Sequence, residues 1–394
     1  MEKVYIVSAK RTAVGAFLGT LANTSAIELA VSTTKAVLED SGVAPEKIDE
    51  VIIGNILSAG LGQNISRQIA LKCGIPESTP AYTVNKVCAS GMKTLQLAYQ
   101  SILLGEANAV IAGGTENMTQ SPHILKGIRQ GVKFGDQALL DTMLNDGLHC
   151  AINDYHMGVT AENIAEKYNI SREEQDNYSA LSQHKAGKAS QNGEFTEEIV
   201  PLQVKKGKVF EEFKIDEYIK AETTAEKLAK LRPAFKTDGS GTVTAGNASG
   251  LNDGAAILLL ANEKFVNENN LKPLAEILGF ASVGIDPKIM GMGPVEAVTK
   301  LLEKTGQRIS DIDLFELNEA FAVQSIAVVK ELKINPDLVN VNGGAIAIGH
   351  PIGASGARIV VTLLHALKKR ALNTGVASLC VGGGMGIAMS VKML

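Results

Sequence analysis

Short apolar runs alternate with amphipathic stretches over the first 118 residues of the chain. The runs are typical of buried strands and occupy Val4–Ala9, Ile48–Asn55, Ala81–Val84 and Ala109–Ala112. Apolar residues three or four positions apart predict the helices between them, over Ser25–Ser41, Ile65–Cys73 and Met92–Leu103. Strands that alternate with helices in this way favour an α/β fold with a mostly parallel sheet and helices on its faces.

The pattern changes between residues 119 and 248. This stretch is more charged and has few strand-like runs. Helices are predicted over Thr160–Tyr168 and Ser171–Gly193, and Ser171 with Glu174 forms a capping-box pattern at the start of the second. Because uninterrupted loops of this length are uncommon unless they are functional, we expect an inserted loop domain at 119–248.

The first pattern returns after residue 249. Strands are predicted over Gly254–Leu260, Leu274–Val283, Ile312–Asn318, Val376–Cys380 and Gly386–Val391. Helices are predicted over Pro294–Gly306, from Asn318 through Val329, and over Ser355–Lys369. We therefore expect an N-terminal α/β half at 1–118, completed by about 249–271, and a C-terminal α/β half at 272–394.

The two halves resemble each other at a nearly constant spacing. The strand that ends at Asn55 matches the strand that ends at Asn318, and Ala89-Ser90-Gly91 matches Ala354-Ser355-Gly356, where each triplet opens a helix. A glycine pair, Gly113-Gly114, and a glycine cluster, Gly382–Gly384, follow later strands. The pattern predicts a duplicated α/β unit, although glycine-rich α/β sequences often look alike.

Composition narrows the class of protein. The 394 residues, 45% of them hydrophobic, are enough for two or three domains with an ample core. The net charge of −4 disfavours nucleic acid as the main partner. We see no signal peptide and no apolar run long enough to cross a membrane. The four cysteines form no CxxC pair, so we expect no metal site. So few cysteines in a chain of this length fit a reducing compartment, so we expect a cytoplasmic protein.

Cys88 is the first candidate for chemistry. It lies among small residues in Asn85-Lys86-Val87-Cys88-Ala89-Ser90-Gly91, directly before a predicted helix. The unpaired N–H groups at a helix N-terminus favour a thiolate, which is a good nucleophile. A nucleophile also needs a base and an oxyanion site.

Three other stretches lie at strand ends or helix starts, where open α/β sheets place their sites. Asn318 follows a strand in Asn318-Glu319-Ala320-Phe321, where a helix cap is the simpler interpretation. His350 lies in the rigid loop Gly349-His350-Pro351 and is a candidate base, unless it is a solvated loop residue. Cys380 precedes Gly382-Gly383-Gly384 and is a second candidate thiol, unless it is a buried structural cysteine.

Together, these four stretches resemble the signatures of the thiolases, in the same order and across essentially the whole chain, and among them the biosynthetic acetoacetyl-CoA type. The resemblance implies a thiolase-like fold: two duplicated α/β halves with mixed sheets, packed in an αβαβα arrangement, plus the inserted loop domain. It implies an acetyl-CoA C-acetyltransferase, which joins two acetyl-CoA molecules into acetoacetyl-CoA and CoA or runs the reverse thiolysis. The CoA thioesters are substrates, and no cofactor is implied.

The resemblance also implies roles for the four side chains. Cys88 would carry the acetyl group, His350 would take the proton of Cys88, and Cys380 would be the acid and base at carbon. His350 and a water held by Asn318 would form one oxyanion site, and the backbone N–H groups of Cys88 and Gly382 a second. If the thiols of Cys88 and Cys380 face each other, mild oxidation would join them.

Contacts to CoA are implied for a further set of residues, most of them in the inserted segment. The set is Leu148, His156, Met157, Lys220, Ala234, Phe235, Ala245, Ala248, Ser249, Leu251, Met290, Ala320 and Phe321. Apart from the resemblance, His156 and Met157 fit packing at a helix entry. Lys220 stands where the family pattern has an Arg, and Lys227 where it has a small polar residue, so the outer CoA contacts differ from that pattern.

Other functions fit parts of the pattern. A degradative 3-ketoacyl-CoA thiolase for longer chains shares all four stretches, and a ketoacyl synthase would have two histidines and no Cys380. A catalytically silent CoA-binding protein, or a soft-metal site built from Cys88, Cys380 and His350, would belong to another class. The resemblance also implies a homotetramer, a dimer of dimers assembled through the inserted segment, and the apolar residues of Leu139–Leu144 are compatible with it.

Overall fold

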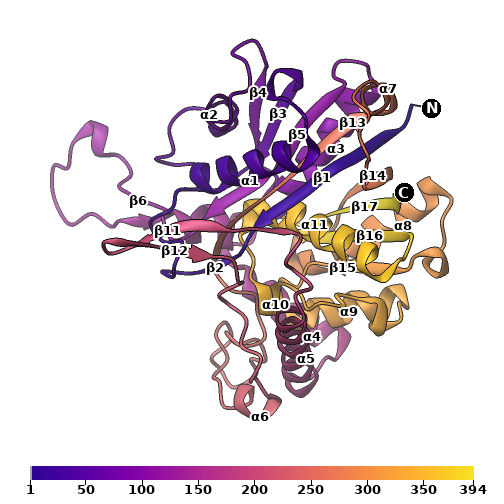
Figure 1. Ribbon diagram of the computed structural model, residues 1–394. Coiled ribbons are helices and arrows are strands. Elements are labelled where there is room, and N and C mark those ends of the chain that lie inside the picture. The colour runs from indigo at the N-terminus through magenta and orange to yellow at the C-terminus, as the bar shows by residue number, and fades with distance from the viewer. Residues whose placement is uncertain (1) are drawn as a thin grey trace.

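The computed structural model describes residues 2–394 of the chain (Figure 1). One half of its main sheet has the strand order β1-β13-β5-β3-β4, and the short strands β2 and β10 pair with β13 and β1. The bounds are β1 Val4–Thr12, β2 Gly15–Ala16, β3 Glu50–Gly54, β4 Ala81–Val84, β5 Ala109–Asn117, β10 Ile199–Val200 and β13 Asn252–Asn262. The other half has the order β14-β17-β16-β15, with β14 Ala275–Gly284, β15 Leu314–Leu317, β16 Thr374–Val381 and β17 Met385–Met393.

The same pairing pattern occurs in both halves. Strand β3 runs parallel to β5, and β15 runs parallel to β16. The next pairs are antiparallel in each half: β5 with β13 and β13 with β1, then β16 with β17 and β17 with β14. Two residue pairs between β1 and β14 join the halves. The predicted duplication is confirmed, whereas the mostly parallel sheet expected from element order is wrong, because β13 and β17 each run antiparallel to both of their neighbours.

The register also corrects one part of the predicted repeat. Gly114 lies opposite Gly54, and Ser378 lies opposite Leu317. The glycine pair Gly113-Gly114 therefore lies inside β5 and corresponds to Ala377-Ser378. It does not correspond to Gly382–Gly384, which make the tight turn between β16 and β17.

The helices divide the halves into layers. Helices α1 (Ala26–Ser41) and α2 (Ile65–Lys72) cover the outer face of the first half, and α8 (Gly293–Thr305) and α9 (Ala322–Leu332) cover that of the second. Helices α3 (Ser90–Leu103) and α11 (Ile352–Arg370) lie between the two halves in a shared core. This order is the αβαβα arrangement that the resemblance implied. The short helices α7 (Glu263–Glu268) and α10 (Ala345–Ile348) lie in connections.

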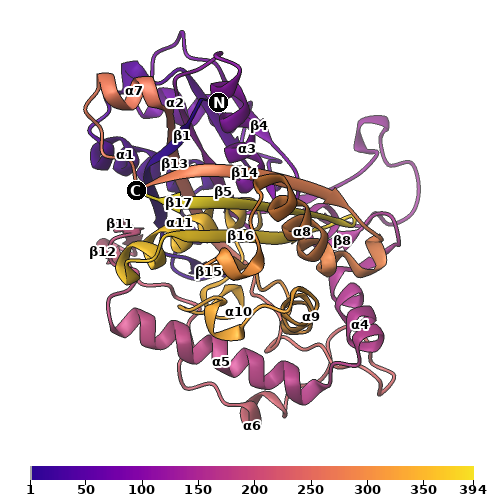
Figure 2. The same ribbon diagram turned by 90° about the vertical axis from the view of Figure 1, so that its right-hand side faces the viewer.

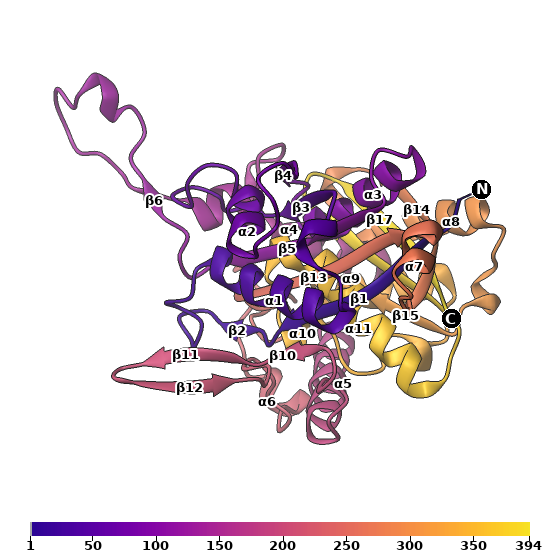
Figure 3. The same ribbon diagram turned by 45° about the horizontal axis from the view of Figure 1, so that its top comes forward.

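The inserted segment packs against the second half. Its long helices α4 (Met157–Tyr168) and α5 (Arg172–Gln191) run beside α9 and α10 (Figure 2). Two parts project outward: the arm between β6 (His123–Ile124) and β7 (Leu140–Asp141), and the hairpin of β11 (Leu202–Lys206) and β12 (Val209–Phe213) (Figure 3). Strands β8 (His149–Cys150) and β9 (Tyr155–His156) and helix α6 (Ala225–Leu228) are short.

Two helices begin earlier than the sequence predicts. Helix α4 starts at Met157 because the His156 ring accepts a hydrogen bond from the Gly158 N–H and caps it. Helix α11 starts at Ile352, directly after Pro351, so the loop that carries His350 is only a few residues long. This short loop places His350 at the junction of the two halves.

Candidate active site

A single cavity of about 320 Å³ gathers most of the predicted site residues. Cys88, His350 and Gly382 line it, as do all of the predicted CoA contacts except Lys220. The cavity also includes residues that sequence reasoning missed: Val87, Met118, Leu144, Gly147, Tyr218, Gly250 and Ile352. Val87, Gly147 and Gly250 lie next to a predicted site residue in the chain, so a search of the flanking positions would have found these three.

Lys220 is an exception among the predicted contacts. Its side chain is exposed, and its ammonium lies 5.3 Å from the centre of the Tyr218 ring. The backbone N–H of Lys220 donates to Gln183 on α5. Tyr218, two residues earlier, is the residue that lines the cavity. The structure therefore brings Tyr218 to the site and places Lys220 outside its lining.

A strained turn presents Cys88 to this cavity. Val87 has φ +47°, a left-handed conformation that is costly for a β-branched residue. The turn is held by the Asn85 side chain, which accepts from the Val87 N–H, and by Ser90, whose hydroxyl donates to the Val87 carbonyl. Strain of this kind persists only where the surroundings enforce it, and here it sets the position of the thiol.

The acidity of Cys88 differs from the expectation. Helix α3 begins at Ser90 with Ala89 as its cap, so Cys88 lies just outside the helix. Burial raises the pKa of the Cys88 thiol to about 11, and hydrogen bonds from the backbone N–H groups of Gly382 and Cys88 itself only partly oppose this. The expected thiolate is therefore wrong for the free enzyme. The two N–H groups nevertheless meet at the sulfur, where an oxyanion site is useful.

His350 is held rigidly and kept neutral. Its Nδ1 lies 2.6 Å from the Ser355 hydroxyl, and its backbone N–H donates to the Asn252 side-chain oxygen. Because the Ser355 hydroxyl donates to the Pro351 carbonyl, it is free to accept from Nδ1–H, which leaves Nε2 as the acceptor. Burial, with a smaller contribution from the Arg358 charge, lowers the pKa of His350 to about 3. The imidazole can thus act as a base.

Asn318 and Cys380 are buried and lie outside the cavity lining. Neither polar atom of the Asn318 amide has a partner, an arrangement that is rare unless a water or substrate oxygen binds there. Burial, and then the nearby Cys88 thiol, raises the pKa of Cys380 well above its usual range. Both thiols are free, and their oxidative link stays a prediction that peptide mapping after peroxide treatment tests.

Aromatic side chains form one wall of the cavity. The His156 ring stacks on Phe235 with centroids 4.6 Å apart, and Phe235 meets Phe321 edge to face at 6.3 Å. His156 also caps α4, so the structural and the cavity-lining interpretations of this residue both hold. The stack joins the inserted segment to the loop that follows β15.

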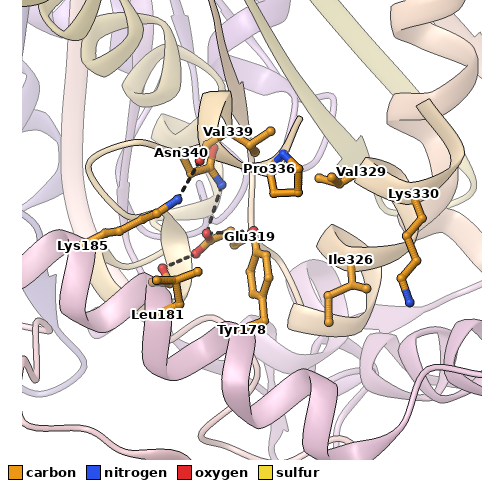
Figure 4. A pocket seen from close by; sticks show the side chains of 11 residues that line it. Tyr178, Leu181, Lys185, Glu319, Ile326, Val329, Lys330, Pro336, Val339 and Asn340 are labelled. Atoms are coloured by element: carbon orange, nitrogen blue, oxygen red, sulfur yellow. Dashed lines mark hydrogen bonds between the residues drawn. The ribbon is translucent and has the colours of Figure 1, made fainter. Parts of the chain in front are cut away.

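Glu319, which follows Asn318 in the chain, holds the Asn318 loop in place through hydrogen bonds. Its buried carboxylate accepts from Tyr178 and Ser182 on α5 and from the Asn340 amide (Figure 4). It also accepts from the Ile346 N–H. A second cavity of about 170 Å³ lies beside it. Sequence reasoning gave Glu319 no role of its own, although a charged residue in an apolar run was a signal. It ties the Asn318 loop to the inserted segment and to the chain before His350.

Two further findings concern metal sites and membrane-spanning helices. No group of three or more His, Cys, Asp and Glu side chains in residues 2–394 is arranged to hold a metal ion. No helix in the same part of the chain is both long and apolar enough to cross a membrane.

Solved structures of similar overall shape cover the whole chain. A crystal structure of the Bacillus anthracis acetyl-CoA acetyltransferase matches with a TM-score of 0.97 and 45% identity, over 100% of this chain and 99% of that one. Human mitochondrial 3-ketoacyl-CoA thiolase in complex with CoA matches with a TM-score of 0.96 and 43% identity, over 100% of this chain and 98% of that one.

Relatives found by sequence share a higher percentage of identical residues with this chain. An acetyl-CoA acetyltransferase of Chromobacterium violaceum is 55% identical over 392 residues, 99% of each chain. A probable acetyl-CoA acyltransferase of Staphylococcus aureus is 54% identical over 394 residues, which is 100% of this chain and 99% of that one. The thiolase N-terminal domain matches residues 4–264, and the thiolase C-terminal domain matches residues 271–393. With both family domains and a full-length structural match in place, the chain belongs to the thiolase family.

Proposed function

We propose that this chain is an acetyl-CoA C-acetyltransferase that condenses two acetyl-CoA molecules into acetoacetyl-CoA and CoA and also runs the reverse thiolysis. The observation that carries the proposal is that Cys88, His350 and Gly382 line the same 320 Å³ cavity. The inserted segment contributes apolar and aromatic side chains to the lining, among them Leu148, Met157 and Phe235. A CoA thioester fits such a site, with its acyl end at the thiol.

In the first half-reaction, His350 Nε2 takes the proton of Cys88, and the sulfur attacks the thioester carbon of acetyl-CoA. The N–H groups of Cys88 and Gly382 stabilise the oxyanion that forms. The bond from carbon to the CoA sulfur then breaks, and the departing thiolate takes the proton of Cys380. The products are acetyl-Cys88 and CoA, with His350 protonated and Cys380 ionised.

In the second half-reaction, the Cys380 thiolate removes a methyl proton from the second acetyl-CoA. Protonated His350 and the group bound by the Asn318 amide stabilise the enolate oxygen. The enolate carbon attacks acetyl-Cys88, a carbon–carbon bond forms, and the bond to the Cys88 sulfur breaks. His350 returns its proton to Cys88, so both thiols regain their starting state.

The proposal also covers the domains, the oligomeric state and the location of the protein. The inserted segment, 119–248, would bind CoA and join subunits, between α/β halves at 1–118 with 249–271 and at 272–394. The arm between β6 and β7 exposes Ile128, Val132, Phe134 and Leu139, which supports a homotetramer; light scattering of the purified protein tests the mass. The free cysteines support a location in the cytoplasm, which fluorescence of a tagged chain tests.

The Cys88→Ala variant tests the nucleophile. Labelled acetyl-CoA should acetylate one thiol of the native protein and none of the variant, whereas Cys73→Ala, a buried cysteine on the far side of the first half, should behave as the native protein does. Acetylation of a thiol in Cys88→Ala would show that the assigned nucleophile is wrong.

A degradative 3-ketoacyl-CoA thiolase is the second candidate, since the human mitochondrial 3-ketoacyl-CoA thiolase has nearly the same fold. The side chains of Met157 and Met290 occupy the cavity, which favours a short acyl group. Turnover of acetoacetyl-CoA should therefore exceed that of 3-ketoacyl-CoA substrates with 8 to 16 carbons. Faster cleavage of the longer substrates would favour the second candidate.

A further inference from the structure

The proposed chemistry leaves one buried carboxylate beside the nucleophile without a role. Glu116 lies near the end of β5 and is fully buried. The strand registers make it the counterpart of Cys380: Glu116 is two residues beyond Gly114, which faces Gly54, and Cys380 is two residues beyond Ser378, which faces Leu317. Each half of the fold thus places one ionisable side chain at the same point of its sheet.

Four donors hold the Glu116 carboxylate. One oxygen accepts from the Asn55 amide at 2.7 Å and from the Leu57 N–H at 3.2 Å. The other accepts from the Ile56 N–H at 3.1 Å and from the Gly353 N–H at 3.0 Å. Gly353 is the second residue of α11, the helix that follows His350 directly. Glu116 therefore connects the end of β3 to the first turn of the His350 helix.

The packing here leaves no space for adjustment. A methyl group at Gly353 would stand 2.6 Å from the Glu116 carboxylate, and one at Gly91, in the first turn of α3, would stand 2.8 Å from the backbone nitrogen of Ala357. Ile56, Leu57 and Ile352, which flank the donors of Glu116, form one apolar cluster against which Cys88 packs. The buried carboxylate and the half-buried nucleophile are therefore neighbours, and only Cys88 lines the cavity.

The charges around Glu116 are uncompensated. Asp253 on β13 and Cys88 in the turn before α3 are the ionisable groups whose charges interact with Glu116. No basic side chain described in residues 2–394 forms an ion pair with Glu116. A negative charge in such surroundings acts on its neighbours with little screening.

We propose that Glu116 is a positioning residue with an electrostatic effect: it fixes the first turn of α11, and with it His350, while its charge disfavours the thiolate of Cys88 until substrate is bound. The resting thiol is thereby protected from stray electrophiles. The inference rests on the proposed function for its catalytic part only. Burial raises the pKa of Glu116 to about 7, so this charge is present above neutral pH and is lost as the pH falls.

The test is alkylation of Cys88 by iodoacetamide at pH 8, followed by peptide mass mapping. Glu116→Gln removes the charge and is expected to alkylate about tenfold faster than the native protein. Its turnover of acetoacetyl-CoA should fall, because an amide cannot accept from all four donors. Glu116→Asp keeps the charge and should alkylate at nearly the native rate. Glu162→Gln, a buried carboxylate on α4 that accepts from the Thr242 and Val243 N–H groups and lies outside the cavity lining, is the control and should leave the rate unchanged.

The outcomes separate the two proposals. Alkylation that is no faster in Glu116→Gln, or equally faster in Glu116→Asp, would show that packing and not charge is responsible, and would overturn the inference. If Glu116→Gln does not fold, the pH dependence of alkylation in the native protein is the test. The rate should fall by less than tenfold per pH unit between pH 8 and pH 6. A full tenfold fall per pH unit would overturn the inference. A native protein without thiolase turnover would count against the proposed function alone.

Discussion

Ser355 provides the sharpest test of how His350 works. Its hydroxyl lies 2.6 Å from His350 Nδ1, and both groups are buried. Ser355→Ala leaves that nitrogen without a partner, which costs about 1–3 kcal/mol for a buried donor. At about 1.4 kcal/mol per tenfold change in rate, the expected loss is about 5-fold to 150-fold. The loss should fall on the rate, because the hydrogen bond strengthens as His350 becomes charged.

The assay is single-turnover acetylation of Cys88 with labelled acetyl-CoA, together with steady-state kcat/KM for acetoacetyl-CoA. Ser390→Ala is the matched control, since that buried serine also donates one hydrogen bond, to Gln307, and lies outside the cavity lining. The control should keep native rates. A folded Ser355→Ala protein within twofold of native in both assays would refute the assigned tautomer and the role of Nε2 as the base.

Three further predictions concern other parts of the chain. Asn318→Ala should lower the condensation rate by about 10²–10³ while Cys88 still becomes acetylated, and equal losses in both steps would contradict its assignment to the enolate. Phe235→Ala should raise KM for acetyl-CoA by about 3- to 10-fold, because it removes the stack on His156, and a lower kcat at unchanged KM would argue against this. The hydrogen bond from Lys330 lowers the pKa of Glu174 to about 2 from an ordinary value of 4.5. The stability that the Glu174 carboxylate contributes is therefore present above pH 4.5 and is lost as the pH falls toward 2. The melting temperature of Glu174→Gln should depend less on pH over that range than the melting temperature of the native protein.

Much of the fold could be predicted from local pattern. Apolar spacing placed β4 at Ala81–Val84 and ended α1 at Ser41, as the structure has them. The recurrence of Asn55 at Asn318 indicated the duplication, which the pairing of β3 with β5 and of β15 with β16 confirms. Strand direction could not be predicted, because an apolar run is equally compatible with a parallel and an antiparallel neighbour.

Only some residues of the candidate site could likewise be predicted from local sequence pattern. Cys88, His350 and Gly382 lie among small residues at element ends, a signal that a single sequence carries. The inserted residues that line the cavity, such as Phe235, carry no such signal, and only the resemblance pointed to them. Tyr218 and Glu319 were missed because their contacts come from segments distant in the chain.

By itself, then, the sequence determined the order of the elements and the duplication and indicated candidates for the reacting groups, since each of these rests on residues that are close together in the chain. Only the tertiary structure decided the protonation states of those groups. The position of Cys88 near a helix start predicted a thiolate, yet its pKa is raised, because desolvation by packed neighbours outweighs the helix. The Gly382 N–H lowers this pKa and the Glu116 charge raises it; these two groups come from opposite halves of the chain and meet only when it folds.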